Sequence, residues 1–402
     1  IYNTISNSLT CFIDSTNQNL LPDNAVGICF DDGYAKFLNP GAFDAFEVSE
    51  TDLCGLPYTS GTTGKPKGVY LTHKGQQWAA RILVEHRRLS ADERILISAP
   101  FFHKNALVAI KTALLPGASL ITLPRFEARQ ALQAIHDHRI TMMTGVPTML
   151  YMMMAQTDLV GSLDLSSVTT VSMGSAPASD RLIERIHETF PNAQVQYNYG
   201  ITEGGPLMVG WFHPEGKERP LGSVGYPLPQ CDYLFDGGPH NKQGELIVRN
   251  PGVALGYHNL PHATAEKFQN GWFRTGDILR EDEDGWLYFV GRVDDMFTCS
   301  GENVFPSEVV LLLERHPAIA QAVVLPFDDE RRGQVPVAFL KLEIGVPVDE
   351  ESVKQYALAK GPAYAHPRQV FFVEDFPLSG TNKIDQAALR RIAENEGEGL
   401  DA

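Results

Sequence analysis

Short apolar runs alternate with amphipathic stretches along the first half of the chain. The apolar runs have the length of buried strands and occupy residues 94–98, 119–123, 141–144 and 168–173. The stretches between them have helical periodicity and occupy residues 75–87, 129–138 and 179–190. Alternating strands and helices predict an α/β fold, in which a parallel sheet is covered by helices and binds ligands at the carboxyl ends of its strands.

The pattern changes after residue 220. Short β-like runs at residues 244–249 and 286–290 are separated by Gly, Pro and Asn turns, which predicts a small antiparallel subdomain. From about residue 295 the pattern is mixed α+β, with strands expected at 320–325 and 335–342 and helices at 307–315, 350–360 and 385–394. The boundaries we predict are 1–219 for a large α/β part, 220–293 for its β-rich subdomain and 294–402 for a C-terminal α+β domain. The first 50 residues are mostly polar loops.

One stretch between two apolar runs concentrates glycines, hydroxyl residues and lysines. It comprises Thr59, Ser60, Gly61, Thr62, Thr63, Gly64, Lys65 and Lys67. Backbone N–H groups in a glycine-rich turn, hydroxyls and lysines together suit a polyphosphate. A Walker loop is excluded, because only two residues separate Gly61 from Gly64 and Pro66 follows Lys65. We expect this loop at the carboxyl end of a strand of the parallel sheet; a flexible surface turn is the alternative.

Composition excludes several partners. The net charge is −16 with acidic residues spread throughout, which argues against nucleic acid and anionic membranes. No apolar run approaches the ~18 residues of a membrane span, and the five scattered cysteines suggest reduced thiols in a cytoplasmic protein. His136 and His138 lie in a polar helical stretch without further ligands, so a solvated face is expected there instead of a metal site. The methionines clustered at 142–154 predict core packing, with an apolar acyl tunnel as the alternative.

The glycine- and lysine-rich loop resembles the signature of the adenylate-forming (ANL) superfamily, which joins acyl-CoA and aryl-CoA synthetases to peptide-synthetase adenylation domains and luciferases. Further motifs follow in the family's order. Tyr199-Gly200-Ile201-Thr202-Glu203 matches Tyr-Gly-x-Thr-Glu, the turn at 174–177 matches a turn along the adenine, and Lys383 lies in the last signature. The match covers about residues 50–395. Because the chain begins with Ile1 and only 57 residues precede Tyr58, we expect part of the usual N-terminal portion to be missing.

The resemblance implies a set of nucleotide contacts in the large domain. They are Thr59, Ser60, Gly61, Thr62, Thr63, Gly64, Lys65, Lys67, Gly174, Ser175, Ala176, Pro177, Asn198, Tyr199, Gly200, Asp277 and Arg292. Within this set, Tyr199 would stack on the adenine and Asp277 would hold the ribose hydroxyls. Thr202 would contact the α-phosphate, and Glu203 would hold Mg²⁺.

The resemblance also implies roles for residues that bind the acid and for a residue about which the C-terminal domain moves. His103, after Phe102, occupies the place where domains for α-amino acids carry an aspartate, so an apolar or aryl acid is expected; a core histidine is the alternative. Asp294 would be the hinge about which the C-terminal domain rotates. Lys383 would bridge the acid and the α-phosphate, although Asn382 stands before it where the family has Gly.

The function implied is ATP-dependent activation of a carboxylic acid to an acyl-adenylate, with release of pyrophosphate and transfer to coenzyme A. ATP, Mg²⁺ and coenzyme A are the expected cofactors and co-substrates. Two alternatives stay open: a stand-alone enzyme that loads an acyl carrier protein, and a nucleotide-binding relative without turnover. The sequence leaves the identity of the acid and the oligomeric state open.

Overall fold

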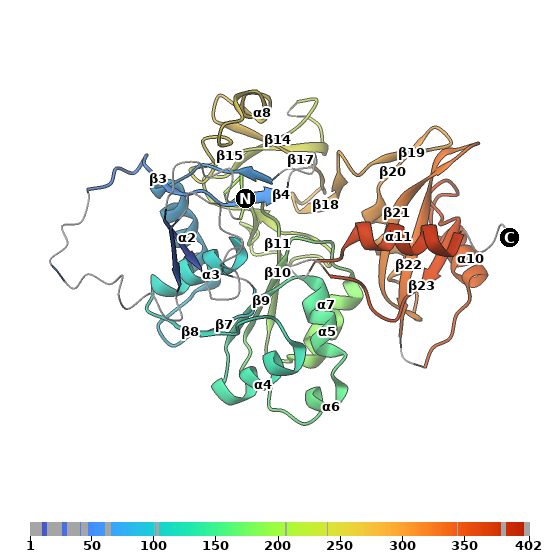
Figure 1. Cartoon of the computed structure of the whole chain (residues 1–402), viewed down its shortest axis with the longest axis horizontal. Coiled ribbons are helices and arrows are strands. Elements are labelled where there is room, and N and C mark those ends of the chain that lie inside the picture. The colour runs from blue at the N-terminus through green and yellow to red at the C-terminus, as the bar shows by residue number, and fades with distance from the viewer. Residues whose placement is uncertain are drawn as a thin grey trace.

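The computed structural model describes residues 10–13, 26–29, 41, 47–60, 66–99, 101, 104–205, 207–238, 240–343, 345–378 and 383–397. Its central feature is a parallel sheet with the strand order β11-β10-β9-β7-β8 (Figure 1). The strands are β7 (Arg94–Ile97), β8 (Ser119–Thr122), β9 (Met142–Gly145), β10 (Thr170–Gly174) and β11 (Gln194–Asn198). Every apolar run expected to form this sheet does so, and the α/β prediction is confirmed.

Helices cover both faces of the parallel sheet (Figure 1). They are α2 (His73–Arg87), α3 (Lys104–Leu114), α4 (Ala128–His138), α5 (Pro147–Met154), α6 (Thr157–Val160) and α7 (Asp180–Thr189). Ile95, Ile97 and Met142 pack with α3 on one face, whereas Met143 and Val171 pack with α4, α5 and α7 on the other. The sequence pattern predicted α2, α4 and α7 but not α3 or α5.

The clustered methionines belong to the core. Met143, Met149, Met153 and Met154 are each at most 4% exposed, and α5 carries three of them against the sheet. Unbranched, polarizable side chains fill irregular apolar space of this kind. Core packing is therefore confirmed in preference to an acyl tunnel at these positions.

The glycine- and lysine-rich loop connects a hairpin outside the parallel sheet. Strands β4 (Tyr58–Ser60) and β5 (Pro66–Gly68) pair antiparallel, with Thr59 opposite Lys67. The expectation that the loop follows a strand of the parallel sheet is wrong, because the apolar runs on either side of it pair with each other: β3 (Leu53–Gly55) lies against β6 (Leu71–Thr72). A separate short pair, β1 (Thr10–Ile13) and β2 (Val26–Cys29), is parallel.

Antiparallel structure begins with β12, before residue 220, and continues through residues 220–290, where it was expected. Strand β17 pairs with β15, β16 and β18. The elements are β12 (Val209–Trp211), β13 (Tyr226–Pro227), β14 (Asp232–Phe235), β15 (Gln243–Arg249), α8 (Pro261–Lys267), β16 (Phe268–Gln269), β17 (Trp272–Glu281) and β18 (Leu287–Arg292). Hydrophobic side chains on β15, β17 and β18 join the main core of the large domain.

The C-terminal part folds around its own two small cores. Its sheet has the order β20-β19-β22-β21, with β23 parallel to β22. The elements are β19 (Phe297–Cys299), β20 (Glu302–Val304), α9 (Pro306–Leu313), β21 (Ile319–Asp329), β22 (Gly333–Leu342), α10 (Glu350–Lys360), β23 (Gln369–Phe372) and α11 (Gln386–Gly397). The helices expected at 307–315, 350–360 and 385–394 are α9, α10 and α11.

Helices α5 and α7 of the large domain contact the C-terminal part (Figure 1). Arg181 donates to the carbonyl oxygens of His316, Pro317 and Ile319 at 3.0–3.2 Å, and it also pairs with Glu343 at 3.1 Å. No helix in the part of the chain described above is long and apolar enough to cross a membrane.

Candidate active site

The buried carboxylate of Asp277 connects the antiparallel sheet of β14 to β18 with the end of strand β11 in the parallel sheet. Asp277 lies on β17, directly opposite Arg292 on β18, and its Oδ1 accepts a bond from Arg292 Nη1 at 2.9 Å. Its Oδ2 accepts a bond from the hydroxyl of Tyr199, which follows β11, at 2.7 Å. Gly276 has φ +74°, a conformation that favours glycine, immediately before the carboxylate.

Burial controls the chemistry of this group. Asp277 is 3% exposed, and desolvation raises its pKa, while the charge of Arg292 and the bond from Tyr199 act in the opposite direction. The charge of Glu203 also acts on Asp277, which places both carboxylates at one site. Arg292 and Tyr199 thus each hold one oxygen of the Asp277 carboxylate in a fixed orientation.

Lys383, from the C-terminal part, reaches the same place. Burial lowers the pKa of Lys383, the charge of Arg292 lowers it further, and the charge of Asp277 raises it. The side chain is half-buried. Lys383 and Asp277 are far apart in the sequence, and the C-terminal part, which contacts α5 and α7, brings the lysine close enough for the two charges to interact.

Glu203 lies at the base of the β4–β5 hairpin. Its Oε1 accepts a bond from the hydroxyl of Thr59 at 3.1 Å and one from Tyr257 at 3.3 Å. Lys67 Nζ lies 5.3 Å from the centre of the Tyr257 ring, so a cation stands over the same aromatic group. The structure therefore brings Thr59, Lys67 and Glu203 to one place around Tyr257.

The turn at 174–177 begins where β10 ends beside β11. A Cβ on Gly174 would lie 2.5 Å from the carbonyl oxygen of Asn198, so the strands approach more closely than any other residue allows. Ser175 has φ +68°, an uncommon conformation for a residue other than glycine. Strained backbone of this kind is characteristic of ligand-binding turns.

Some predicted residues lie outside the described part of the chain. They are Gly61, Thr62, Thr63, Gly64, Lys65 and His103, together with the neighbouring Phe102 and with Asn382. His136 and His138 are exposed on α4, as expected for a solvated face. Sequence reasoning missed Tyr257, which lies in no motif; backbone bonds between its segment and residues 68–70, and from the Ala254 N–H to the Glu203 carbonyl oxygen, place it beside Glu203.

The site suits a magnesium ion carried by a phosphate ligand. No group of three or more His, Cys, Asp or Glu side chains that could hold a metal occurs among the described residues. Mg²⁺ commonly binds through one or two carboxylates plus substrate phosphates and water, which is what Glu203 beside the hairpin offers. When bound there, Mg²⁺ would neutralise phosphate charge.

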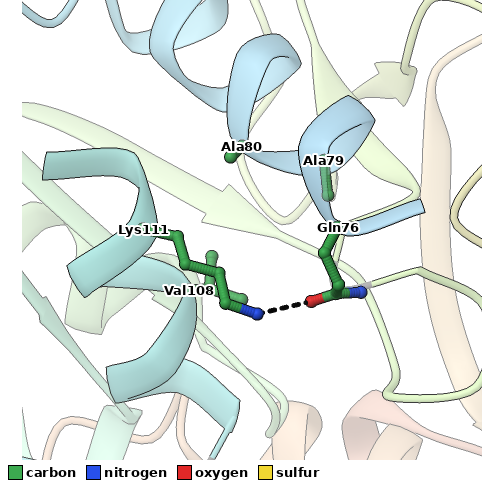
Figure 2. A pocket seen from close by; sticks show the side chains of 5 residues that line it. All are labelled: Gln76, Ala79, Ala80, Val108 and Lys111. Carbon is green, nitrogen blue, oxygen red and sulfur yellow. Dashed lines mark hydrogen bonds between the residues drawn. The ribbon is translucent and has the colours of Figure 1, made fainter. Parts of the chain in front are cut away.

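A separate shallow cleft lies between α2 and α3 (Figure 2). Lys111 donates to Gln76 Oε1 across it at 3.0 Å, and Ala79, Ala80 and Val108 complete its lining. None of these residues was predicted to contact the nucleotide, and the cleft is not part of the Asp277 site.

The site combines the buried carboxylate of Asp277, the β4–β5 hairpin and a lysine from the C-terminal part, which are segments of the motifs that resemble adenylate-forming enzymes. The profile of the AMP-binding enzyme family matches residues 15–258, and that of the AMP-binding enzyme C-terminal domain matches residues 311–383. The chain belongs to this family. It is an AMP-forming acid–thiol ligase, and enzymes of this kind use ATP, Mg²⁺ and coenzyme A.

Named relatives agree with the family. A 4-coumarate–CoA ligase of Solanum tuberosum is 33% identical and covers 94% of this chain and 74% of its own length. A 2-succinylbenzoate–CoA ligase of Geobacillus sp. (strain WCH70) is 35% identical, covering 87% of this chain and 70% of its own length.

Solved structures agree as well. An anthranilate CoA ligase in complex with anthranoyl-AMP has a TM-score of 0.84 at 26% identity, covering 96% of this chain and 78% of its own. The o-succinylbenzoate coenzyme A synthetase of Bacillus subtilis, in complex with ATP and magnesium ion, has a TM-score of 0.78 at 30% identity. The match covers 96% of this chain and 80% of the synthetase chain.

Proposed function

We propose that this site activates an aryl or apolar carboxylic acid with ATP and passes the acyl group to coenzyme A. The observation that carries the proposal is the meeting of Lys383 with Asp277 and Arg292, since it brings a cation from the C-terminal part to the predicted ribose carboxylate. The relatives named for 4-coumarate, anthranilate and 2-succinylbenzoate support an aryl acid.

One group of residues in the site neutralises the charge of the phosphates. A carboxylate that attacks ATP meets repulsion between two anions, so the site must neutralise phosphate charge and align the reactants. Lys67 and the hydroxyl of Thr59 would face the phosphates, and Glu203 would hold Mg²⁺, which would neutralise phosphate charge. Thr202 contacts the α-phosphate.

The nucleoside is held by the other half of the site. Asp277 accepts the ribose hydroxyls, Arg292 orients that carboxylate, and Tyr199 lies against the adenine beside the turn at 174–177. Lys383 stabilises the charge that develops at the α-phosphate. A second conformation, reached by rotation about Asp294, withdraws the lysine before the thiol attacks.

The decisive experiment is carboxylate-dependent exchange of labelled pyrophosphate into ATP, followed by thioester formation with coenzyme A. We expect exchange with aryl acids, and thioester formation with coenzyme A in preference to an acyl carrier protein. ATP binding without exchange for any acid would contradict the proposal and favour a nucleotide-binding relative. Pyrophosphate exchange followed by transfer only to a carrier protein would show that the acyl acceptor is the carrier protein and not coenzyme A.

A further inference from the structure

One oxygen atom of Glu203 joins three separate parts of the candidate site. Glu203 Oε1 accepts bonds from the hydroxyl of Thr59 at 3.1 Å and from the hydroxyl of Tyr257 at 3.3 Å. Thr59 belongs to the β4–β5 hairpin, Glu203 to the Tyr-Gly-x-Thr-Glu segment, and Tyr257 to the stretch before α8. Within the described part of the chain, no side chain donates to the other oxygen, Oε2. The carboxylate is thus held at one oxygen and open at the other.

The stretch that carries Tyr257 is fixed between the hairpin and the Glu203 segment. On one side, the His258 N–H donates to the carbonyl oxygen of Gly68 at 2.8 Å, directly after β5 pairs with β4. On the other side, the Ala254 N–H donates to the carbonyl oxygen of Glu203 at 2.8 Å. Because backbone bonds tie this stretch to both neighbours, the hydroxyl of Tyr257 has a fixed place beside the carboxylate.

The ring of Tyr257 is buried and its hydroxyl keeps its proton. Tyr257 is 8% exposed, and its ring meets the ring of Phe268 edge-on with 5.4 Å between the centres. Burial raises the pKa of Tyr257, and the charge of Glu203 raises it further. A phenol with a raised pKa remains protonated at neutral pH, so the Tyr257 hydroxyl donates and the Glu203 carboxylate accepts.

The face of the same ring contacts a cation of the hairpin. Lys67 Nζ lies 5.3 Å from the centre of the Tyr257 ring, within the range of a cation–π interaction. Lys67 is also the register partner of Thr59, which donates to Glu203. Tyr257 therefore touches both charged groups expected at the phosphates: its ring face holds Lys67, and its hydroxyl holds Glu203.

Two donors on one oxygen have a consequence for metal binding. A carboxylate that ligates a metal is normally oriented by hydrogen-bond partners behind it, and loss of such a partner weakens metal binding. Mg²⁺ is commonly held by one or two carboxylates together with phosphate oxygens and water. The bonds from Thr59 and Tyr257 restrict rotation of the Glu203 carboxylate, and they leave Oε2 as the oxygen that is available to a metal.

We propose that Tyr257 is a positioning residue, which holds Glu203 by one oxygen so that the other can bind the Mg²⁺ that accompanies ATP, and which keeps Lys67 beside the phosphates. The inference rests on the proposed function in assigning Mg²⁺ to Glu203. It divides the site into two parts. The part around Tyr257 serves the metal-bound triphosphate, whereas the part around Asp277 serves the nucleoside and should bind AMP without a metal.

The test measures metal–nucleotide binding in the absence of any acid. Tyr257→Phe removes the hydroxyl and keeps the ring. The probe is the Mn²⁺ complex of α,β-methylene-ATP, whose binding is followed by electron paramagnetic resonance of the metal. We expect Tyr257→Phe to bind this complex about 10-fold more weakly and to change the spectrum of the bound Mn²⁺, as for loss of a partner that orients a metal ligand. Calorimetric binding of AMP without metal should change by less than about 2-fold, because the hydroxyl acts on the metal carboxylate alone.

A matched control lies on the antiparallel sheet. The hydroxyl of Tyr233 donates to Glu281 Oε2 at 3.0 Å, so Tyr233→Phe removes a bond of the same kind outside the candidate site and should leave binding of the Mn²⁺ complex unchanged. The double variant Tyr257→Phe/Glu203→Gln should bind the complex no more weakly than Glu203→Gln alone, since Tyr257 acts through the carboxylate. If Tyr257→Phe does not fold, Thr59→Val, which removes the second donor to the same oxygen, carries the comparison.

Three results would overturn the inference. One is a Tyr257→Phe variant that binds the Mn²⁺ complex as wild type does. Another is a variant that loses AMP as strongly as the complex, which would mean that Tyr257 supports the whole site and not the metal carboxylate. The third is an additive loss in the double variant. If the wild type exchanges pyrophosphate with no acid, the proposed function fails by itself, and the binding measurements, which contain no acid, still decide the role of Tyr257.

Discussion

At the scale of single residues, the carboxylates that the motifs identify are oriented by hydrogen-bond partners from other parts of the chain. Asp277 was predicted from its position, yet its orientation depends on a hydroxyl from Tyr199, 78 residues away in sequence, and on Arg292 across the strand pair. Glu203 similarly depends on Tyr257, which has no sequence signal. A motif therefore locates a functional side chain, whereas its partners are found only when separate elements meet.

Lys383 is the residue whose loss should separate the two half-reactions. In Lys383→Ala, acyl-adenylate formation should fall by about 10²–10³-fold, because a preorganised donor at the developing charge is removed. Thioester formation from supplied acyl-adenylate should keep most of its rate. Exchange and single-turnover thioester assays measure the two steps.

Lys360→Ala, at an exposed position in the last turn of α10, is the matched control and should leave both steps unchanged. An equal fall of both steps in Lys383→Ala would contradict a lysine that acts in adenylation alone.

At the scale of elements, the apolar pattern predicted the parallel strands well because each is buried on both faces. The exceptions are informative. The sequence before α3 carries no capping signal, so the start of this helix was not predicted. Helix α5 consists mostly of methionines and other apolar residues, so it lacks the one-sided periodicity that identifies an amphipathic helix. The phosphate-type loop was misplaced because its short flanking runs pair with each other.

The contact between β10 and β11 gives a prediction about the turn at 174–177. In Gly174→Ala the new Cβ would meet the carbonyl oxygen of Asn198 at 2.5 Å, and backbone cannot yield as a side chain can. We expect a loss of stability of about 1–3 kcal/mol, typical of overpacking, together with weaker binding of AMP. Urea unfolding and calorimetry measure the two effects.

Gly145→Ala makes the same change at the end of the neighbouring strand β9, where the nearest atom is a methionine side chain at 3.8 Å. This control should change stability by less than about 1 kcal/mol. If Gly174→Ala binds AMP as wild type does, the turn is not part of the nucleotide site.

At the scale of the whole molecule, the contact between α5, α7 and the C-terminal part sets where Lys383 lies. Arg181→Ala removes bonds to three carbonyl oxygens and an ion pair with Glu343. We expect adenylation to fall about 10-fold or more while thioester formation from acyl-adenylate is spared. The double variant Arg181→Ala/Lys383→Ala should adenylate no more slowly than Lys383→Ala alone, since Arg181 acts through the lysine.

Arg129→Ala removes an exposed ion pair with Asp158 on the same domain and serves as the control. Additive losses in the double variant would show that Arg181 does not act by placing Lys383.

The same contact should make stability depend on pH. Glu314 is 5% exposed and accepts bonds from Tyr151 and from the Ala322 N–H; burial raises its pKa from 4.5 to about 7. The groups facing it across the contact are Tyr151, Ser179 and Arg181. The folded state therefore binds more protons than the unfolded chain between about pH 4.5 and 7, so the contribution of Glu314 is full below pH 4.5 and is lost as the pH rises through 7.

Glu314→Gln is uncharged at every pH and should remove this dependence. Its stability relative to wild type should rise by roughly 2–3 kcal/mol between pH 4.5 and 8, as measured by urea unfolding. A constant difference between the two proteins across that range would show that Glu314 does not titrate within it.

The sequence by itself determined which chemistry this protein carries and most of its regular structure, because motifs and apolar periodicity are local in the chain. Loop composition, the Tyr-Gly-x-Thr-Glu segment and the apolar runs are all features of the sequence. Only the tertiary structure decided which of these features meet. The approach of Lys383 to Asp277, the bond from Tyr199 to Asp277 and the bond from Tyr257 to Glu203 all join segments far apart in sequence. Packing and burial create those contacts, and neither is encoded in any single stretch of residues.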